Sequence, residues 1–285
     1  MSDRTVRTED GVDLALHRLR AYRDGRPAAL LVHGAFSNHN VWLRRAHPGG
    51  FAHYLLGRGL DVWLADLRHH GLSGREPGRG QWRFEDWILR DAPTLIGRVL
   101  DETDGAPLTW VGHSAGGAVG LCWQARPQPE TKTQLAAIVT FGTPGPTRVG
   151  IARRGFAAIA AATGRALGTF PARWLGMGSE NEAGRIIADW MTWNITGRWV
   201  GQDGFDYFNA LSSVVSPFLS VTGGADYVFA PAAACADLVE RVGSRRKALA
   251  VHPGLTHRGL LRDPRARERC WPETAGWLQE LVSVA

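Results

Sequence analysis

The chain has 285 residues, enough for one large domain or two modest ones with a hydrophobic core. Hydrophobic residues make up 44% and charged residues 21%, a globular composition that excludes a disordered chain and a coiled coil. The 33 basic and 27 acidic residues give a net charge of +6, but the arginines are spread along the chain without the basic stripe of a nucleic-acid binder. We therefore expect a solvated basic surface and no nucleic-acid partner.

The cysteines and the hydropathy of the chain indicate the cellular compartment of the protein. Cys122, Cys235 and Cys270 are an odd number without close spacing, which argues against a disulfide framework and a zinc site and fits a reduced compartment. No apolar signal segment is visible at the N-terminus. The longest uncharged stretch, residues 105–125, is interrupted by glycines and a histidine and is typical of a buried strand and helix rather than a membrane span. These features predict a cytoplasmic protein without a membrane span and without a metal.

Apolar runs alternate with helical patterns along most of the chain. Two short strands, 5–9 and 14–19, are expected around the turn Asp10-Gly11. Further strands are predicted at 28–32, 62–65, 109–111, 136–141, 218–221 and 248–251. Helices are predicted at 51–58, 84–100, 115–124 and 232–242, with a last helix over 265–284 that Pro272 breaks. Continuous apolar strands between helices predict an α/β fold with a mostly parallel sheet covered on both faces.

One stretch interrupts this alternation. Residues 147–212 show no convincing strand, only helical patterns such as 151–162 and 182–193. This is too long for a loop in a compact domain. We expect a helical cap insertion at 147–212 over one end of a core formed by residues 1–146 and 213–285.

The sharpest chemical feature is the G-x-S-x-G motif at residues 112–116. It follows an apolar run and precedes a helical pattern, as a nucleophile elbow requires. The two glycines permit a strained strand-to-helix turn that exposes Ser114 at the N-terminus of a helix. We therefore predict Ser114 to be a catalytic nucleophile.

A serine nucleophile needs a base that an acid orients. His257 lies on a glycine-containing loop after the last apolar run and is the preferred base, while the nearby His252 is expected to be structural or at the surface. Asp226 follows the penultimate strand and is the preferred acid. Asp66 also follows a strand, but it precedes Ser114 and is expected to bind backbone amides of its own loop. The order Ser114, Asp226, His257 is that of α/β-hydrolase elbow enzymes.

Backbone N–H donors for an oxyanion are predicted at two places. One is the N–H of Ala115, directly after the nucleophile. The other lies after the third strand, where Gly34 permits an unusual turn: the N–H of Ala35 is preferred, with Phe36 as the alternative. His33 is expected only to tie this loop down by hydrogen bonds.

On these motifs the chain resembles the α/β-hydrolase superfamily, in the capped branch that includes lysophospholipase-like and lipase-like esterases. The matching pieces are His33-Gly34, the loop 66–74, the elbow 112–116, Asp226 and His257. The resemblance implies an eight-stranded, mostly parallel sheet with helices on both faces, a helical cap after the sixth strand, and no cofactor. The chain departs from the usual D-x-R-G-x-G loop at His69, which stands in place of a glycine. This puts the local backbone in doubt and leaves His69 or His70 as candidates to point at the pocket.

The residue type at the elbow narrows the class of reaction that we expect. Haloalkane dehalogenases and soluble epoxide hydrolases use an aspartate at the elbow, so Ser114 favours carboxylic ester hydrolysis through an acyl-enzyme. An acyltransferase or a thioesterase with the same triad is the alternative, and a non-catalytic small-ligand binding protein is the alternative of another class.

Aromatic residues of the insertion predict the kind of substrate. Trp190 and Trp193 are three residues apart and share a helix face. With Phe36 and His113 they are expected to form pocket wall, which favours apolar, short- to medium-chain acyl or alkyl groups. The sequence leaves the oligomeric state open.

Overall fold

The central sheet has eight strands. The computed structural model describes residues 2–19, 25–43, 49–75, 82–127, 134–147 and 150–282. Within them the strand order is β1-β2-β4-β3-β5-β6-β9-β10, parallel except for the antiparallel pairs β1–β2 and β2–β4. The strands are β1 (Ser2–Arg7), β2 (Asp13–Leu19), β3 (Ala28–Val32), β4 (Asp61–Ala65), β5 (Leu108–His113), β6 (Ala137–Phe141), β9 (Phe218–Gly223) and β10 (Lys247–His252). The predicted fold class is confirmed.

Strand β3 shows why the central strands are continuous apolar runs. All five of its residues are buried. Leu30 and Val32 face one hydrophobic cluster, and Ala29 and Leu31 face another on the opposite side of the sheet. Because successive side chains of a strand point to opposite faces, a strand covered on both faces buries every position, and in β3 every position is apolar.

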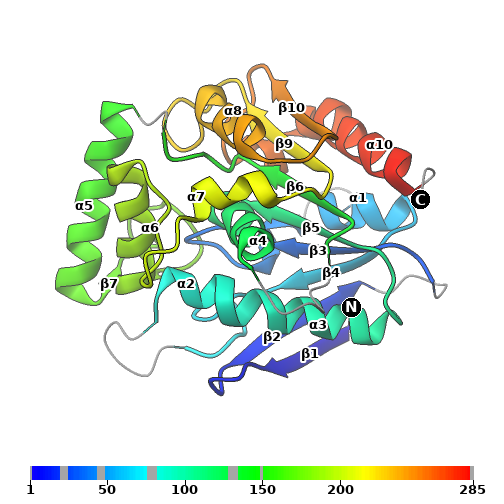
Figure 1. Ribbon diagram of the computed structural model, residues 1–285, viewed down its shortest axis with the longest axis horizontal. Helices are drawn as coiled ribbons and strands as arrows, with labels where there is room; N and C mark the ends of the chain where they lie inside the picture. The colour runs from blue at the N-terminus through cyan, green and yellow to red at the C-terminus, as the bar shows by residue number, and fades with distance from the viewer. Residues whose placement is uncertain are drawn as a thin grey trace.

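Helices cover both faces of this sheet (Figure 1). Residues of α2 (Phe84–Asp86), α3 (Ala92–Glu102), α4 (Ala115–Ala125) and α8 (Ala232–Arg241) belong to one cluster. Residues of α1 (Phe51–Gly57), α9 (Gly259–Arg262) and α10 (Trp271–Val282) belong to the other. No helix in these described ranges is long and apolar enough to cross a membrane.

The predicted break at Pro272 was wrong. A π-helical turn, η4 (Ala266–Cys270), runs directly into α10, so the helix passes through the proline. The same arrangement precedes Pro93, where the π-helical turn η2 (Trp87–Asp91) leads into α3. Proline removes a helical N–H and crowds the preceding turn, and the wider π turn adjusts the backbone there. The last two residues of the predicted helix, 283 and 284, lie outside the described residues.

Residues 147–212, called the insertion below, leave the sheet after β6 and return before β9. They include α5 (Ile151–Leu167), α6 (Gly184–Thr196) and α7 (Tyr207–Ala210), and they end within the short 3-10 helix η3 (Leu211–Ser213). Residues 148 and 149 lie outside the described ranges. Figure 1 shows α5 and α6 side by side at one end of the sheet. They approach so closely that a Cβ on Gly184 would lie 2.3 Å from the carbonyl oxygen of Gly164.

The expectation of no strand in the insertion needs correction. The two-residue strands β7 (Thr169–Phe170) and β8 (Glu182–Ala183) pair antiparallel. Such short strands carry no readable alternation, and only the tertiary pairing reveals them. Strand β8 is important because it brings Glu182 to the core.

Candidate active site

Ser114 occupies a strained turn between β5 and α4. Its φ is +52° and its ψ is −125°, in a region that residues other than glycine rarely adopt. The glycines around it are required by close backbone approach. A Cβ on Gly112 would lie 2.4 Å from Cα of Gly117, and one on Gly116 would lie 2.2 Å from the carbonyl oxygen of His33. The G-x-S-x-G pattern therefore records the geometry of an elbow.

The predicted base and acid lie together. Nδ1 of His257 is 2.7 Å from Oδ2 of Asp226. The backbone N–H groups of Phe229 and Ala230 each donate to the same carboxylate at 3.0 Å. Burial works to raise the pKa of Asp226, but the hydrogen bond and charge of His257 outweigh it and hold this pKa below its usual value. Asp226 is therefore a carboxylate that fixes the orientation of the imidazole.

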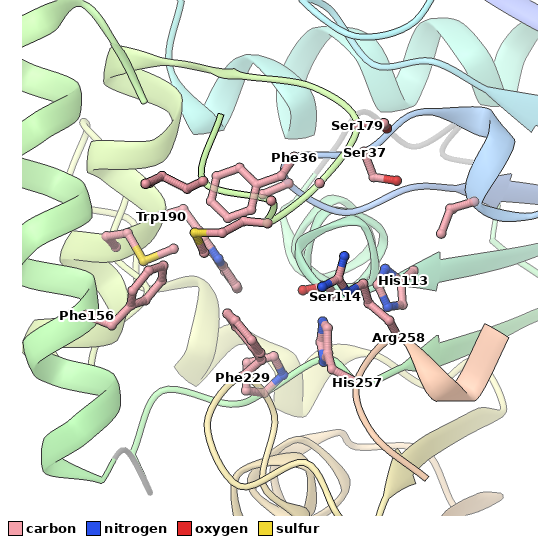
Figure 2. Close-up of a pocket in the computed structure, with 18 of the residues that line it drawn as sticks. Phe36, Ser37, His113, Ser114, Phe156, Ser179, Trp190, Phe229, His257 and Arg258 are labelled. Carbon is pink, nitrogen blue, oxygen red and sulfur yellow. The ribbon is translucent and has the colours of Figure 1, made fainter. Parts of the chain in front are cut away.

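Ser114 and His257 line the same cavity, of about 500 Å³. The His257 ring points toward Ser114 (Figure 2). The end of β6 and the turn after it position both Ser114 and His257. The N–H of Ser114 donates to Phe141 O at 2.8 Å. A Cβ on Gly142, whose φ is +60°, would lie 2.9 Å from Nδ1 of His257. The structure thus brings together three side chains that are far apart in the sequence.

The loop after β3 passes directly against the elbow. A Cβ on Gly34 would lie 2.7 Å from Cβ of Ser114 and 3.4 Å from the nitrogen of Ala115, so only glycine fits. The N–H of Phe36 donates to Oε2 of Glu182 at 3.3 Å. Because Phe36 already has this partner, Ala35 and Ala115 remain the preferred oxyanion donors.

Apolar side chains of the insertion form one side of the cavity wall. Phe156, Leu175, Met177, Trp190 and Met191 line it from this side. Phe36 and His113 also line it, as expected, and Figure 2 shows Phe36, Phe156 and Trp190 on the same side of Ser114.

Trp193 does not line this cavity, contrary to expectation. Its ring stacks on Trp199, with centroids 5.9 Å apart, and its Nε1 donates to Val200 O at 2.8 Å. Helical spacing placed Trp190 and Trp193 on one face, but that face is wide enough for one ring to reach the cavity and the other to pack in the core.

Known proteins resemble this chain in sequence and in fold. The family model described as serine aminopeptidase, S33, matches residues 26–265. The chain belongs to this α/β-hydrolase family. Lipase member N of Mus musculus is 28% identical over 129 residues, covering 41% of this chain and 32% of that protein. Triacylglycerol lipase 1 of Arabidopsis thaliana is 25% identical over 148 residues, covering 48% of this chain and 37% of that protein. This α/β-hydrolase therefore spans about a third of the length of these curated relatives.

Two solved structures show the same fold over nearly the whole chain. An esterase from Thermogutta terrifontis superposes with a TM-score of 0.66 at 17% identity, covering 99% of both chains. The monoacylglycerol lipase of Paleococcus ferrophilus superposes with a TM-score of 0.64 at 18% identity, covering 95% of this chain and 99% of that one.

The loop after β4 keeps its left-handed turn despite the missing glycine. His69 has a φ of +74°, so histidine adopts the conformation that glycine usually provides there. Neither His69 nor His70 lines the active-site cavity. His70 is fully buried, with its ring 4.8 Å from His33 and 5.5 Å from Trp87. Neither of these two candidates for a residue that points at the pocket therefore does so.

His33 ties the loops together, as expected. Its Nδ1 donates to Gly34 O at 2.8 Å, and its Nε2 accepts the N–H of Leu67 at 3.1 Å. Burial and the charge of the neighbouring His70 together lower the pKa of His33 to about 4, so His33 is neutral at neutral pH.

Glu182, which the sequence analysis missed, links the insertion to the loop after β3. Its Oε2 accepts the N–H of Phe36 and lies 3.2 Å from Nε2 of His70, and both charged side chains are fully buried. Burial opposes ionisation of both groups. The charge of His70 nevertheless lowers the pKa of Glu182, and that of Glu182 raises the pKa of His70. The buried ion pair thus holds the insertion against the loop after β4, and the hydrogen bond from Phe36 holds it against the loop that carries Ala35.

Replacing Glu182 by glutamine should lower the free energy of unfolding by about 3 kcal/mol, because it leaves His70 buried without its counter-charge. His70, whose pKa is raised, stabilises the fold below the ordinary histidine pKa, and this contribution is lost as the pH rises through the raised value. Glu182, whose pKa is lowered, contributes above the ordinary glutamate pKa and loses this contribution as the pH falls through the lowered value. The difference between wild type and Glu182→Gln should therefore be largest between about pH 4.3 and 6.5. Urea unfolding from pH 4 to 9 measures it.

Glu180→Gln is the matched control. Glu180 lies on the same segment, pairs with the exposed Arg75 at 3.3 Å and accepts Asn38 Nδ2, a hydrogen bond that the amide oxygen of glutamine can keep, so we expect a loss below about 1 kcal/mol. Equal losses for the two variants at every pH would contradict the role given to the buried pair.

One cluster of metal-ligating side chains occurs in the described part of the chain: His17, His39 and Asp66, whose ligand atoms lie within 4.8 Å of one another. His39 Nδ1 is 2.8 Å from Asp66 Oδ2, and His17 Nδ1 is 2.7 Å from Asp3 Oδ1. Burial works to lower the pKa of His17, but the hydrogen bonds and charges of Asp66 and Asp3 outweigh it and raise this pKa, which favours the protonated imidazole.

Asp66 also accepts the N–H groups of His39 at 2.7 Å and Leu72 at 3.0 Å, one of them from its own loop as expected. A Cβ on Gly71 would lie 1.9 Å from its Oδ2. Asp66 is therefore a structural carboxylate outside the active-site cavity.

Proposed function

We propose that this α/β-hydrolase cleaves carboxylic esters through an acyl-enzyme on Ser114, with His257 as the base and Asp226 as the acid. One observation carries the proposal: His257, which is paired with Asp226 at 2.7 Å, lines the same cavity as a serine held at a φ of +52°. Strained backbone at a cavity, beside an oriented imidazole, is the arrangement that makes serine a nucleophile.

The proposed reaction has two halves. Oγ of Ser114 attacks the ester carbonyl carbon while its proton passes to Nε2 of His257, whose Nδ1 faces Asp226. The carbonyl oxygen becomes an oxyanion, which the N–H groups of Ala35 and Ala115 stabilise. Nε2–H of His257 then protonates the leaving alcohol, and the carbon–oxygen bond breaks. In the second half, water attacks the acyl carbon while its proton passes to Nε2 of His257, and the same N–H groups stabilise the oxyanion. The bond to Oγ of Ser114 then breaks as His257 returns the proton to Oγ, and the carboxylic acid is released.

Other reactions through the same acyl-enzyme, and a non-catalytic role, remain as alternatives. An alcohol in place of water makes an acyltransferase, and a thioester substrate makes a thioesterase, with the same residues. The family's description names an aminopeptidase, and amide cleavage would use the same acyl-enzyme. A ligand-binding protein without catalysis is the alternative of another class, and the complete triad constellation argues against it.

A panel of p-nitrophenyl esters of increasing chain length tests the proposal. The expected result is turnover of these esters by wild type. Failure to cleave any ester, with tight binding of the same esters, would favour the ligand-binding alternative.

The apolar wall predicts a chain-length preference. Burial is worth about 0.8 kcal/mol per methylene, so kcat/KM should rise up to about fourfold for each added methylene, until the cavity is full. Trp190→Ala removes part of this wall and should flatten the rise without abolishing acetate hydrolysis. Trp174→Ala is the matched control, because this tryptophan of the insertion is 84% exposed and does not line the cavity.

The chain-length account fails if acetate esters are cleaved best by wild type. It also fails if Trp174→Ala flattens the rise as much as Trp190→Ala does.

We also propose the division into a core, 1–146 and 213–285, and a cap, 147–212. The apolar contributions of the insertion to the cavity support it. A cytoplasmic location, without nucleic-acid partners, is proposed as well; the three buried cysteines are not disulfide-bonded, which fits a reducing compartment.

A further inference from the structure

We propose that Arg258 forms an anion-binding subsite in the cavity, so that the preferred substrate is an ester whose leaving group carries a negatively charged oxygen group, a carboxylate or a phosphate. This inference rests on the proposed function, because it names the kind of ester that Ser114 would cleave. It adds a charge preference at one end of the substrate to the apolar preference at the other.

The ionised side chains of the cavity wall carry positive charge. Arg258 and Arg262 line the cavity, and no aspartate or glutamate occurs among the described residues that line it. The nearby carboxylate, Asp226, has only 2% of its side chain exposed and already binds His257 and two backbone amides. A bound anion therefore meets positive charge without an opposing carboxylate at the wall.

Arg258 is also available to a ligand. It is exposed, and within the ranges that the structure describes no carboxylate lies within ion-pair distance of it. By contrast, Arg265 on the same stretch of chain is held by Asp263 at 2.6 Å. A guanidinium offers a planar fork of N–H donors that matches the oxygens of a carboxylate or phosphate.

The direction of Arg258 assigns the anion to the leaving group. Figure 2 shows its side chain reaching toward Ser114 from the side opposite Phe156 and Trp190. His257 must protonate the leaving oxygen, so the leaving group lies on the His257 side, where Arg258 directly follows. The acyl chain then occupies the apolar side under the insertion.

The test compares three hexanoate esters that differ in one substituent of the phenol: 3-carboxyphenyl, 3-phosphonophenyl and the neutral 3-carbamoylphenyl ester. Rates are corrected for the hydroxide-catalysed reaction of each ester. A charge-assisted hydrogen bond is worth about tenfold or more, so wild type should prefer an anionic ester by at least about tenfold in kcat/KM. A larger preference for the phosphonate indicates a phosphate-type group, and one for the carboxylate indicates a carboxylate-type group.

Variants test whether Arg258 causes the preference for an anionic ester. Arg258→Gln should bring the ratio of anionic to neutral kcat/KM close to one, and Arg258→Lys should keep part of it. Arg245→Gln is the matched control: it removes the same charge from an exposed position before the start of β10, away from the cavity, and should keep the wild-type ratio. Raising the salt concentration to 0.5 M should reduce the wild-type ratio.

The two proposals fail differently. Cleavage of the neutral ester as fast as the anionic ones overturns the anion subsite and leaves ester hydrolysis standing. An anionic preference that persists in Arg258→Gln overturns the role of Arg258. If none of the three esters is cleaved and Ser114 does not react with a fluorophosphonate, the proposed function itself fails.

Discussion

Ser114→Ala is expected to abolish ester turnover, with a loss on the order of 10⁶ in kcat, while the protein stays folded. Loss of the nucleophile in related triads has this magnitude. The fold should survive because alanine meets the same positive φ as serine, and the turn is fixed by the glycines and by the hydrogen bond from Ser114 N to Phe141 O. Steady-state kinetics with p-nitrophenyl esters and a thermal melt measure the two parts.

Ser37 and Ser179 provide controls for this result, since both line the same cavity. Replacing either by alanine should leave kcat within about tenfold of wild type, because neither serine lies on the elbow. Activity of Ser114→Ala within tenfold of wild type would end the serine-hydrolase proposal.

His257→Ala should be nearly as damaging as loss of the serine, because His257 is the imidazole that Asp226 orients in the cavity of Ser114. Asp226→Asn should cost about 10⁴ in kcat, since an amide at this position favours the wrong tautomer of the imidazole. The comparison of kcat for the two variants under one set of conditions measures the separate contributions of base and acid.

His252→Ala is the control for this pair. His252 is buried at the end of β10, with its Nε2 3.5 Å from Glu273 Oε2, and it does not line the cavity. We expect it to affect stability more than turnover. A far larger loss of kcat in His252→Ala than in His257→Ala would reassign the base.

Much of the fold was predictable because its signals are local. The strand at 28–32 is apolar at every position because both of its faces are covered, and the elbow at 112–116 needs glycine at fixed places. Likewise, the order of Ser114, Asp226 and His257 after successive strands predicted that they meet at one edge of a parallel sheet. These features depend on neighbours in the chain or on the period of a strand.

Other features depend on approach between distant segments, which no local pattern records. Glu182 looked like the start of a helix, yet it pairs with His70 through a strand of two residues. Trp193 shares a helical face with Trp190 but packs away from the cavity. Arg258 carried one usable signal, its position directly after the predicted base.

Labelling with a fluorophosphonate, followed by peptide mass spectrometry, tests the central proposal most directly. The reagent reacts with a serine only when a base activates it, so it reports nucleophilicity without any assumption about the substrate. We predict a single adduct on Ser114 in wild type, strongly reduced labelling in His257→Ala and none in Ser114→Ala. Labelling of Ser37 or Ser179 instead, or no adduct on folded wild-type protein, would contradict an activated Ser114.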